Sequence, residues 1–307
     1  MGVALVVKRV AVTGANGFVG SACCAHLRAQ GVEVVPLTRE HISLDTDIDI
    51  RPHLTGVDAI VHCAARVHVL QEDAENPAEA FVRANTEATR LMAQQAEEKG
   101  VKRFVFLSSI GVLGNRTAAG APFDENTVPR PHSDYARSKW LAEHYLQEHT
   151  KMQVVILRPP LVYGPEVKAN FLKLLKAVDA RLPLPLRSIH TPRDFLYVQN
   201  LCEAIHQALT VRKAAGKAIN LCDGEAIGVA ELVRALATYM HKTPVLLPCP
   251  EMMLRVAGKV TGKKNMIDGL CNRLEIDNQH ATRILQWTPG TSLHDGLKET
   301  VAWYKTQ

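Results

Sequence analysis

Aromatic side chains are scarce in this chain of 307 residues, of which Phe, Trp and Tyr together make up 5%. The net charge is a mild +5, and Lys and Arg are scattered rather than clustered. A nucleic-acid surface needs a basic patch or stripe, so we expect no nucleic-acid partner. A few surplus positive charges near a pocket would instead suit a diphosphate substrate.

A membrane-spanning run and a metal-ligand cluster are also missing from the sequence. The apolar run over residues 1–7 ends at Lys8 and Arg9, well short of the ~20 residues that span a bilayer, so no membrane attachment is expected. The seven cysteines are an odd number, and neither they nor the 13 histidines show metal-ligand spacing. We expect reduced thiols, a cytoplasmic location and no metal site.

Apolar, β-branched runs alternate with helical patterns along the first two-thirds of the chain. This order predicts an α/β fold of the Rossmann type, a doubly wound parallel sheet with helices on both faces. Ligands of such sheets bind at the carboxyl ends of the strands. The predicted strands are 10–13, 33–37, 59–63, 103–108 and 153–158, and the predicted helices are 21–30, 77–99 and 135–149.

A glycine-rich turn lies between the first predicted strand and the first predicted helix. Residues 13–20 read Thr-Gly-Ala-Asn-Gly-Phe-Val-Gly. Gly14 permits a tight turn, Gly17 lets the backbone approach a pyrophosphate, and Gly20 lets the helix pack closely on the strand. The phosphates of a dinucleotide would then lie at the positive N-terminus of the helix.

Arg39 follows the second predicted strand, about twenty residues after the glycines. An acidic residue there would hold the ribose hydroxyls of NAD, whereas an Arg can meet the 2′-phosphate of NADP. Arg39 therefore favours NADP, although it could also stack on adenine or remain solvated.

Tyr135 and Lys139 lie four residues apart in a predicted helix and so share one face, about 6 Å apart along the axis. A free Tyr has a pKa near ~10, too high for a base at neutral pH. A cation ~4 Å away in a partly buried site is worth roughly 4 kcal/mol, or up to ~3 pKa units. We therefore expect Lys139 to lower the Tyr135 pKa, so that the phenol can exchange a proton with a substrate hydroxyl or ketone.

These two motifs, with Phe106-Leu107-Ser108-Ser109 between them, resemble the extended short-chain dehydrogenase/reductases. The resemblance is greatest to their NAD-dependent epimerase/dehydratase branch acting on nucleotide sugars, and it covers nearly the whole chain. Further matching stretches are His62-Cys63-Ala64-Ala65-Arg66, Asn85-Thr86, Arg158-Pro159, Val162-Tyr163-Gly164-Pro165, Arg193-Asp194-Phe195 and Trp287-Thr288-Pro289.

The resemblance implies a role for each matching residue. Ser109 would hydrogen-bond the substrate oxygen being oxidised, with Ser108 as the alternative, Tyr135 would be the acid/base, and Lys139 would bind the nicotinamide ribose. The implied cofactor-binding residues are Gly14, Asn16, Gly17, Phe18, Val19, Gly20, Arg39, Ala64, Ala65, Arg66, Asn85, Ser108, Tyr135, Lys139 and Pro159.

The last third of the chain is expected to hold the substrate. Candidate substrate-binding residues besides Ser109 are Asn170, Arg187 and Arg193, and the resemblance assigns a substrate phosphate to Arg193, whose planar fork of donors suits a diphosphate. Residues 1–165, with a contribution from about 190–222, would form the NAD(P)-binding domain, and 166–307 mainly the substrate region. Helices are predicted from 170 and over 228–240, 278–286 and 293–304. The family's habit of dimerising through a four-helix contact implies a homodimer.

The leading hypothesis is a UDP-sugar 4-epimerase of the UDP-glucose or UDP-N-acetylglucosamine type, working with NAD or NADP by transient oxidation at C4. Arg39 keeps open an NADPH-dependent reductase of a UDP-4-keto-6-deoxy-hexose, and a reductase of a hydrophobic alcohol would leave Arg193 without a phosphate. A dehydratase is disfavoured, because Ile110 and Gly111 occupy the places of its acidic pair. A non-catalytic dinucleotide sensor would have little need for Tyr135 and Lys139. Leu113 and Leu161 replace residues frequent in epimerases, so the sugar stays open.

Overall fold

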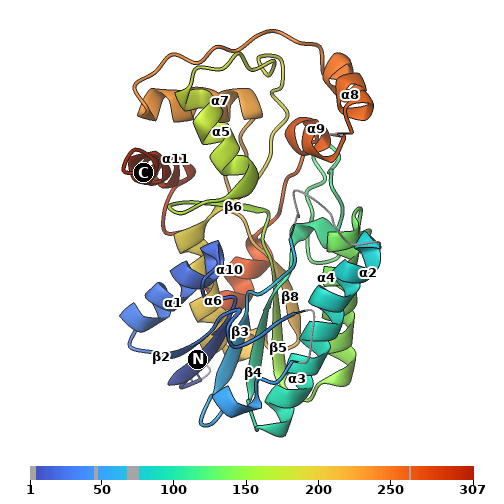
Figure 1. Ribbon diagram of the computed structural model, residues 1–307, viewed down its shortest axis with the longest axis vertical. Coiled ribbons are helices and arrows are strands. Elements are labelled where there is room, and N and C mark those ends of the chain that lie inside the picture. Colours follow the sequence, from blue (N-terminus) through green and yellow to red (C-terminus); the bar gives the residue numbers. More distant parts are fainter. Residues whose placement is uncertain (1–4, 45–47, 68–75, 263) are drawn as a thin grey trace.

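The computed structural model describes residues 5–44, 48–67, 76–262 and 264–307, so the first four residues of the apolar N-terminal run lie outside it. Six parallel strands form the central sheet of the described chain (Figure 1). Their spatial order is β2 (Glu33–Leu37), β1 (Arg9–Thr13), β3 (Ala59–His62), β4 (Arg103–Leu107), β5 (Gln153–Arg158) and β8 (Lys217–Asn220).

The five strands predicted from the sequence are confirmed to within one residue at each end, and β8 is additional. Strands β1, β3 and β4 are apolar and almost wholly buried, as expected for a parallel sheet covered on both faces. Pro36 lies in β2, where an edge strand tolerates a residue without an N–H donor. The strand order reverses between β1 and β3, so the carboxyl ends of these two strands flank the crevice where doubly wound sheets bind ligands.

Helices cover both faces of the sheet, which confirms the predicted Rossmann-type fold (Figure 1). On one face α1 (Phe18–Ala29) packs against α6 (Val198–Thr210), with α10 (Gln279–Leu285) beside α6. On the other face lie α3 (Ala88–Glu98) and α4 (Asp134–His149), over a core that includes Ile60, Phe104 and Met92.

The single helix predicted over 77–99 is wrong in one respect, because it is interrupted. Helix α2 (Pro77–Phe81) passes through a π-helical segment, η2 (Val82–Glu87), into α3. A π segment holds one residue more per turn than an α-helix, and such segments are frequent at functional sites. The extra residue changes which side chains face the sheet, and Asn85 in this segment is buried.

The remaining elements form a smaller part at the carboxyl end of the sheet (Figure 1). A two-stranded parallel sheet of β6 (Leu161–Tyr163) and β7 (Phe195–Tyr197) leads into it. Its helices are α5 (Ala169–Asp179), α7 (Val229–Tyr239), α8 (Glu251–Val260), α9 (Lys264–Cys271) and α11 (Leu293–Tyr304). The sequence predicted α5, α7, α10 and α11 but not α8 or α9.

Four aromatic rings join this smaller part to the rest. Tyr163 stacks on Phe171 with ring centroids 5.5 Å apart, and it contacts Phe195 and Tyr197 at 6.4 and 5.6 Å. These rings belong to one hydrophobic cluster that runs from β1 and β3 to α11 without interruption. The division into residues 1–165 and 166–307 stays a prediction.

We expect Gly20→Ala to destabilise the fold by more than about 1 kcal/mol, the lower end for overpacking. A Cβ at Gly20 would lie 2.0 Å from the Gly14 carbonyl oxygen, so α1 would have to move away from the turn after β1. The measurement is urea unfolding. The matched control is Gly269→Ala in α9, where a Cβ meets nothing within 4 Å and should be neutral or stabilising. Equal stability of the two variants would contradict the close contact.

Candidate active site

Helix α4 places Tyr135 and Lys139 one turn apart. The helix begins after Ser133, whose side chain accepts a hydrogen bond from the Ala136 N–H at 3.2 Å, and Asp134 adds a negative charge to the first turn. Both features stabilise a helix N-terminus. The start of α4 is thus fixed directly before Tyr135.

Lys139 is a buried cation, with 2% of the residue exposed. Its Nζ donates to the Leu107 carbonyl at 2.8 Å and lies 4.5 Å from the centre of the Phe106 ring. Burial lowers the Lys139 pKa to about 8, although the negative charge of Glu143 acts in the opposite direction. Both anchoring residues belong to β4, so Lys139 is held at the carboxyl end of the central sheet.

Tyr135 is half-buried and packs edge-to-face on Phe81, with ring centroids 6.3 Å apart. Burial raises its pKa to about 12. This differs from the sequence-based expectation that Lys139 lowers the phenol pKa. The reason is that desolvation opposes the phenolate, while the Lys139 ammonium is directed to the Leu107 carbonyl. In this arrangement the phenol is the stable form at neutral pH.

Behind Lys139 lies a buried ion pair that the sequence analysis missed. Glu143, one further turn along α4, accepts from Nε of Arg158 at 3.0 and 3.2 Å and from Nη2 at 2.5 Å. The Ser108 hydroxyl also donates to Glu143. Ser108, predicted as a cofactor contact and as the alternative catalytic serine, is therefore bound to Glu143. Three elements, β4, α4 and β5, meet at this carboxylate.

Ser109 follows directly after Ser108 and caps a short 3-10 helix, η3 (Ile110–Val112), by accepting from the Gly111 N–H at 3.1 Å. A Cβ at Gly111 would lie 3.3 Å from the Ser109 Oγ and 3.6 Å from the Ala136 Cβ. Ser109 is therefore close to the first turn of α4, which carries Tyr135. The Pro159 carbonyl accepts from the Ile110 N–H at 2.9 Å and fixes this turn against the end of β5.

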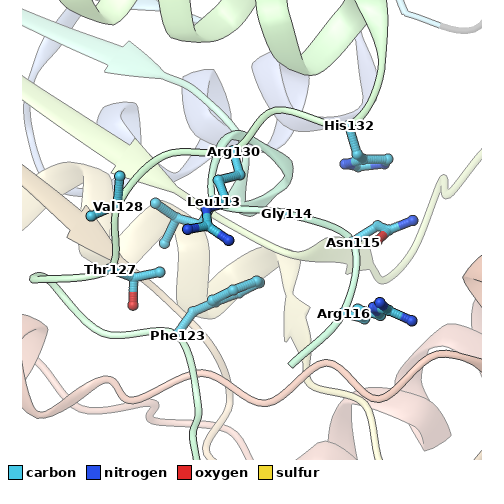
Figure 2. A pocket seen from close by; sticks show the side chains of 9 residues that line it. All are labelled: Leu113, Gly114, Asn115, Arg116, Phe123, Thr127, Val128, Arg130 and His132. Carbon is cyan, nitrogen blue, oxygen red and sulfur yellow. The ribbon is translucent and has the colours of Figure 1, made fainter. Parts of the chain in front are cut away.

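A pocket of about 460 Å³ opens beyond η3. Figure 2 shows its side chains on the segment that leaves η3 and on the one that returns toward α4. Arg116 and Arg130 line it together with His132, whose Nδ1 lies 3.3 Å from the Gly111 carbonyl oxygen. The other lining residues are Leu113, Gly114, Asn115, Phe123, Thr127 and Val128.

The glycine turn forms a compact corner between β1 and α1. Gly14 has a φ of +68°, and its carbonyl accepts from the Gly17 N–H at 2.8 Å. A Cβ at Gly14 would lie 2.9 Å from the backbone of Ala64, so the ends of β1 and β3 are in contact here. Gly17 caps α1 without a side chain, and the first turn of α1 carries no acidic residue. Asn16 is exposed at this corner, and Phe18 and Val19 are half-buried in the first turn.

A chain of buried hydrogen bonds positions the end of β3. The Ala64 N–H donates to the Thr13 hydroxyl at 3.1 Å, and Thr13 lies 2.6 Å from Nδ1 of His62. On the other side, Nε2 of His62 lies 3.0 Å from the Thr89 hydroxyl, which donates to the Asn85 carbonyl. This order assigns the hydrogen to Nε2 and the acceptor to Nδ1. Burial and the nearby Lys139 cation lower the His62 pKa to about 3, so the ring stays neutral.

Asn85 links two of the predicted cofactor segments. Its Oδ1 accepts from the Arg66 N–H at 2.8 Å, and its Nδ2 donates to the Arg66 carbonyl at 3.1 Å and to the Ser138 hydroxyl at 3.0 Å. Ser138 directly precedes Lys139. The structure thus brings together the segment after β3, half-buried at Ala65, with the middle of α4, and the cofactor contact of Asn85 stays a prediction.

The other candidates lie farther out. Arg39 is exposed two residues beyond β2, Asn170 is exposed in the first turn of α5, and Arg187 is exposed with its N–H on the Leu247 carbonyl. Arg193 is half-buried, and its Nη1 donates to the Asn272 carbonyl. Burial lowers the Arg193 pKa to about 10, which leaves the guanidinium charged at neutral pH. The contacts of the described residues do not join these four side chains to Tyr135 and Lys139.

The family model for the NAD dependent epimerase/dehydratase family matches residues 10–222, a range that holds the glycine turn, Ser109, Tyr135 and Lys139. The chain belongs to the NAD-dependent epimerase/dehydratase family. It is therefore an NAD(P)-dependent enzyme of the extended short-chain dehydrogenase/reductase type.

Three proteins illustrate what this chain is similar to. UDP-glucose 4-epimerase from Vibrio cholerae is 35% identical over 311 residues, which cover 95% of this chain and 94% of the relative. UDP-glucose 4-epimerase from Thermus thermophilus, solved with NAD, has a TM-score of 0.76 at 25% identity and covers 97% of this chain and 99% of its own. RMD from Pseudomonas aeruginosa, solved with NADPH, shares the fold, with a TM-score of 0.76 at 22% identity. The match covers 98% of this chain and 100% of RMD.

The glycine corner of this family member fits the phosphates of a dinucleotide. Side chains at Gly14 and Gly20 would fill the space occupied by backbone, and the N-terminus of α1 offers N–H groups beside an exposed Gly17. Gly14, Gly17 and Ala64 would hold the diphosphate side of NAD or NADP, and Lys139 would hold the nicotinamide side.

Sequence reasoning missed Glu143, and it gave no contact to Arg158, Thr13 or His62 although it named them within its motifs. Glu143 could have been found, because residues 135, 139 and 143 share one helix face at i, i+4 and i+8. Arg158 gave no such signal, since its partner lies 15 residues away on another element.

We predict that Glu143→Gln shifts the alkaline limb of the rate profile to lower pH. Removing the negative charge lowers the Lys139 pKa further below about 8, so the cation is lost at lower pH. The same change leaves the Arg158 charge buried and unpaired, which costs about 3–5 kcal/mol in urea unfolding. The measurement is turnover against pH, alongside the unfolding curve.

The matched control is Glu148→Gln, because Glu148 lies on the same helix in an exposed pair with His144. It should change neither quantity by more than a few tenths of a pH unit or about 0.5 kcal/mol. A destabilised Glu143→Gln enzyme with an unshifted pH profile would show that Glu143 acts on stability alone.

Proposed function

We propose that this enzyme is a UDP-sugar 4-epimerase. The observation that carries the proposal is that Ser109 lies close to the first turn of α4, the helix that carries Tyr135 and Lys139, at the carboxyl end of β4. The similarity to the Vibrio cholerae UDP-glucose 4-epimerase along nearly the full length of both chains supports the same reaction class.

In this proposal Tyr135 moves the proton and Ser109 orients the substrate. The Ser109 hydroxyl donates to the oxygen on C4 of the sugar, and Tyr135, as the phenolate, takes the hydroxyl proton from that oxygen as C4 becomes a ketone. When bound, the dinucleotide supplies a nicotinamide, positively charged when oxidised, that accepts the C4 hydride and returns it. A positive charge near Tyr135 offsets the desolvation that raises its pKa to about 12. The ketone then rotates and is reduced from its other face, and Tyr135 returns the proton to the oxygen on C4.

Lys139 contributes a fixed positive charge to this cycle. Its contacts with Leu107 and Phe106 hold the ammonium in place before any ligand arrives. Such preorganised charge costs little rearrangement during the reaction. Below about pH 8 Lys139 is protonated in this structure, which suits turnover near neutrality.

The diphosphate of the substrate would be held on the side of the smaller part. Arg193 is the predicted anchor, and Arg116 and Arg130 add positive charge in the pocket beyond η3. Guanidinium groups bind phosphate oxygens in pairs of parallel hydrogen bonds. Asn170 and Arg187 stay predictions as substrate contacts.

We also propose a homodimer through α3 and α4, where Leu91, Leu141 and Tyr145 are partly exposed.

Tyr135→Phe is expected to lower the rate of 4-epimerisation by about 10²–10⁴-fold, the usual contribution of a general acid/base. Affinity for the dinucleotide should be retained, because only the hydroxyl group is lost and the aromatic ring is kept. The assay incubates the pure protein with UDP-galactose, UDP-N-acetylglucosamine or UDP-N-acetylgalactosamine and separates the C4 epimers by chromatography. Tyr145→Phe on the same helix is the matched control and should keep full activity.

Two outcomes would argue against epimerisation. A wild-type enzyme that interconverts no C4 pair would reject it, whereas stoichiometric oxidation of NADPH with a UDP-4-keto-6-deoxy-hexose would establish the reductase alternative. That alternative rests on Arg39, since a consumed reductant is more often NADPH than NADH.

Arg39→Ala tests the choice of dinucleotide. If the exposed guanidinium meets the 2′-phosphate of NADP, its removal should weaken NADPH binding about tenfold or more and leave NADH binding within about twofold, as expected for loss of a charge-assisted contact. Titration of the reduced dinucleotides by fluorescence measures both. Equal weakening of NADH would instead place Arg39 against the shared adenosine.

A further inference from the structure

Exposed hydrophobic side chains gather in one part of this protein. Among the described residues, seven of the twelve large hydrophobic side chains that are exposed fall between positions 245 and 266. They are Val245, Leu247, Met252, Met253, Val256, Val260 and Met266. Single exposed apolar residues are normal on a protein surface, but a cluster of them marks an interaction surface.

Helix α8 presents most of this cluster on one side. At ~100° per residue, Met252, Met253, Val256 and Val260 fall within about 100° of the helix circumference. Their exposed fractions are 76%, 62%, 55% and 82%. We call these four residues the α8 face. The helix lies at the outer edge of the molecule, away from the central sheet and next to α9 (Figure 1).

The inner side of α8 carries its paired charges. Arg255 donates to Glu251 at 2.7 Å and to Asp268 of α9 at 2.8 Å, while Leu254 and Gly258 are buried. A helix that only stabilises its own domain turns its apolar side inward and its charges to water. Helix α8 does the reverse over most of its surface, so its exposed apolar side is not explained by the packing of this chain.

The charge around the α8 face is positive. Lys259 is exposed beside the apolar stripe, Lys264 is exposed at the start of α9, and the exposed Arg187 lies next to Leu247 through its backbone hydrogen bond. Glu251 and Asp268 are the acidic residues of positions 241–271, and both are paired with Arg255. A partner of negative charge and apolar interior would therefore match this surface.

We propose that the α8 face docks the enzyme peripherally on an anionic membrane surface. Amphipathic helices with an apolar side and flanking lysines bind at the boundary of headgroups and acyl chains. No helix of residues 5–44, 48–67, 76–262 and 264–307 is long and apolar enough to cross a membrane, so the contact is with one leaflet. This departs from the expectation of no membrane attachment, which considered only membrane-spanning runs of the sequence.

A second copy of this chain fits the α8 face less well. In a symmetric pair the same patch meets itself, so Lys259 and Lys264 of both copies would surround one apolar contact. The acidic residues within reach are already paired with Arg255. Anionic headgroups, by contrast, provide the missing opposite charge.

Docking through α8 would bring the membrane close to the substrate side of the enzyme. Asn272, directly after α9, accepts from Arg255 through its side chain at 2.9 Å and from Arg193 through its carbonyl. Its Nδ2 also donates to the Asn115 carbonyl at 3.4 Å, and Asn115 lines the pocket beyond η3. The inner side of α8, through Arg255, and the predicted phosphate anchor Arg193 are thus linked through one residue.

Flotation with lipid vesicles tests the proposal on the full chain. We expect the wild type to float with vesicles of phosphatidylglycerol and phosphatidylethanolamine in equal parts, and about tenfold less with phosphatidylcholine vesicles. Met252→Ser with Val256→Ser should lower binding to the anionic vesicles about tenfold, because binding scales with the apolar area inserted. Lys259→Glu with Lys264→Glu should lower it similarly, and added salt should weaken wild-type binding.

The matched controls are Val6→Ser, a 76% exposed apolar residue outside this cluster, and Lys213→Glu with Lys217→Glu, two exposed lysines near β8. They should float as the wild type does, and thermal melting of every variant, independent of enzymatic activity, checks the fold. Absent flotation of the wild type, or equal flotation of the Met252→Ser and Val256→Ser variant, overturns the proposal. A change from dimer to monomer in that variant, measured by light scattering without wild-type flotation, would instead identify the α8 face as a contact between copies.

Discussion

The active site depends on the interactions of one buried carboxylate, that of Glu143. It compensates the charge of Arg158 from β5, accepts from Ser108 at the end of β4, and acts electrostatically on Lys139 one turn away. An unpaired charge in such a dry region is destabilising, because its desolvation costs several kcal/mol. The positions of α4 and of the two strand ends are therefore set together, before any ligand binds.

A similar dependence holds at the ends of β1 and β3. The close approach of Gly14 to Ala64 requires that β1 and β3 end at the same level, and the hydrogen bonds of Thr13 and His62 hold them there. His62 lies near both this corner and Lys139. Burial and the Lys139 cation lower its pKa, so the ring stays neutral. The glycine corner and the middle of α4 are thus connected through neutral polar groups.

The outer surface of α8 differs from these sites, because its apolar side chains are exposed. Its charges are satisfied inward by Arg255, and its Met and Val side chains are left toward solvent. In most helices of soluble proteins the apolar side is buried within the domain. The apolar side of α8 faces outward instead, which indicates a second apolar environment outside the protein. A protein with a membrane-facing side of this kind would present its substrate pocket near lipid headgroups.

Local physics in the sequence was enough for the fold class and for the placement of Tyr135 and Lys139 on one helix face. The strands of the sheet are continuous apolar runs, the turn after β1 needs glycines, and Tyr135 and Lys139 share a helix face, so each follows from neighbouring residues. The tertiary structure decided everything that depends on contacts distant in sequence. It placed Ser108 on Glu143, paired Glu143 with Arg158, gave Tyr135 a desolvated environment that raises rather than lowers its pKa, and turned the apolar side of α8 outward. Periodicity shows that a helix has an apolar side, but the neighbours that cover that side or leave it exposed are fixed only when the chain folds.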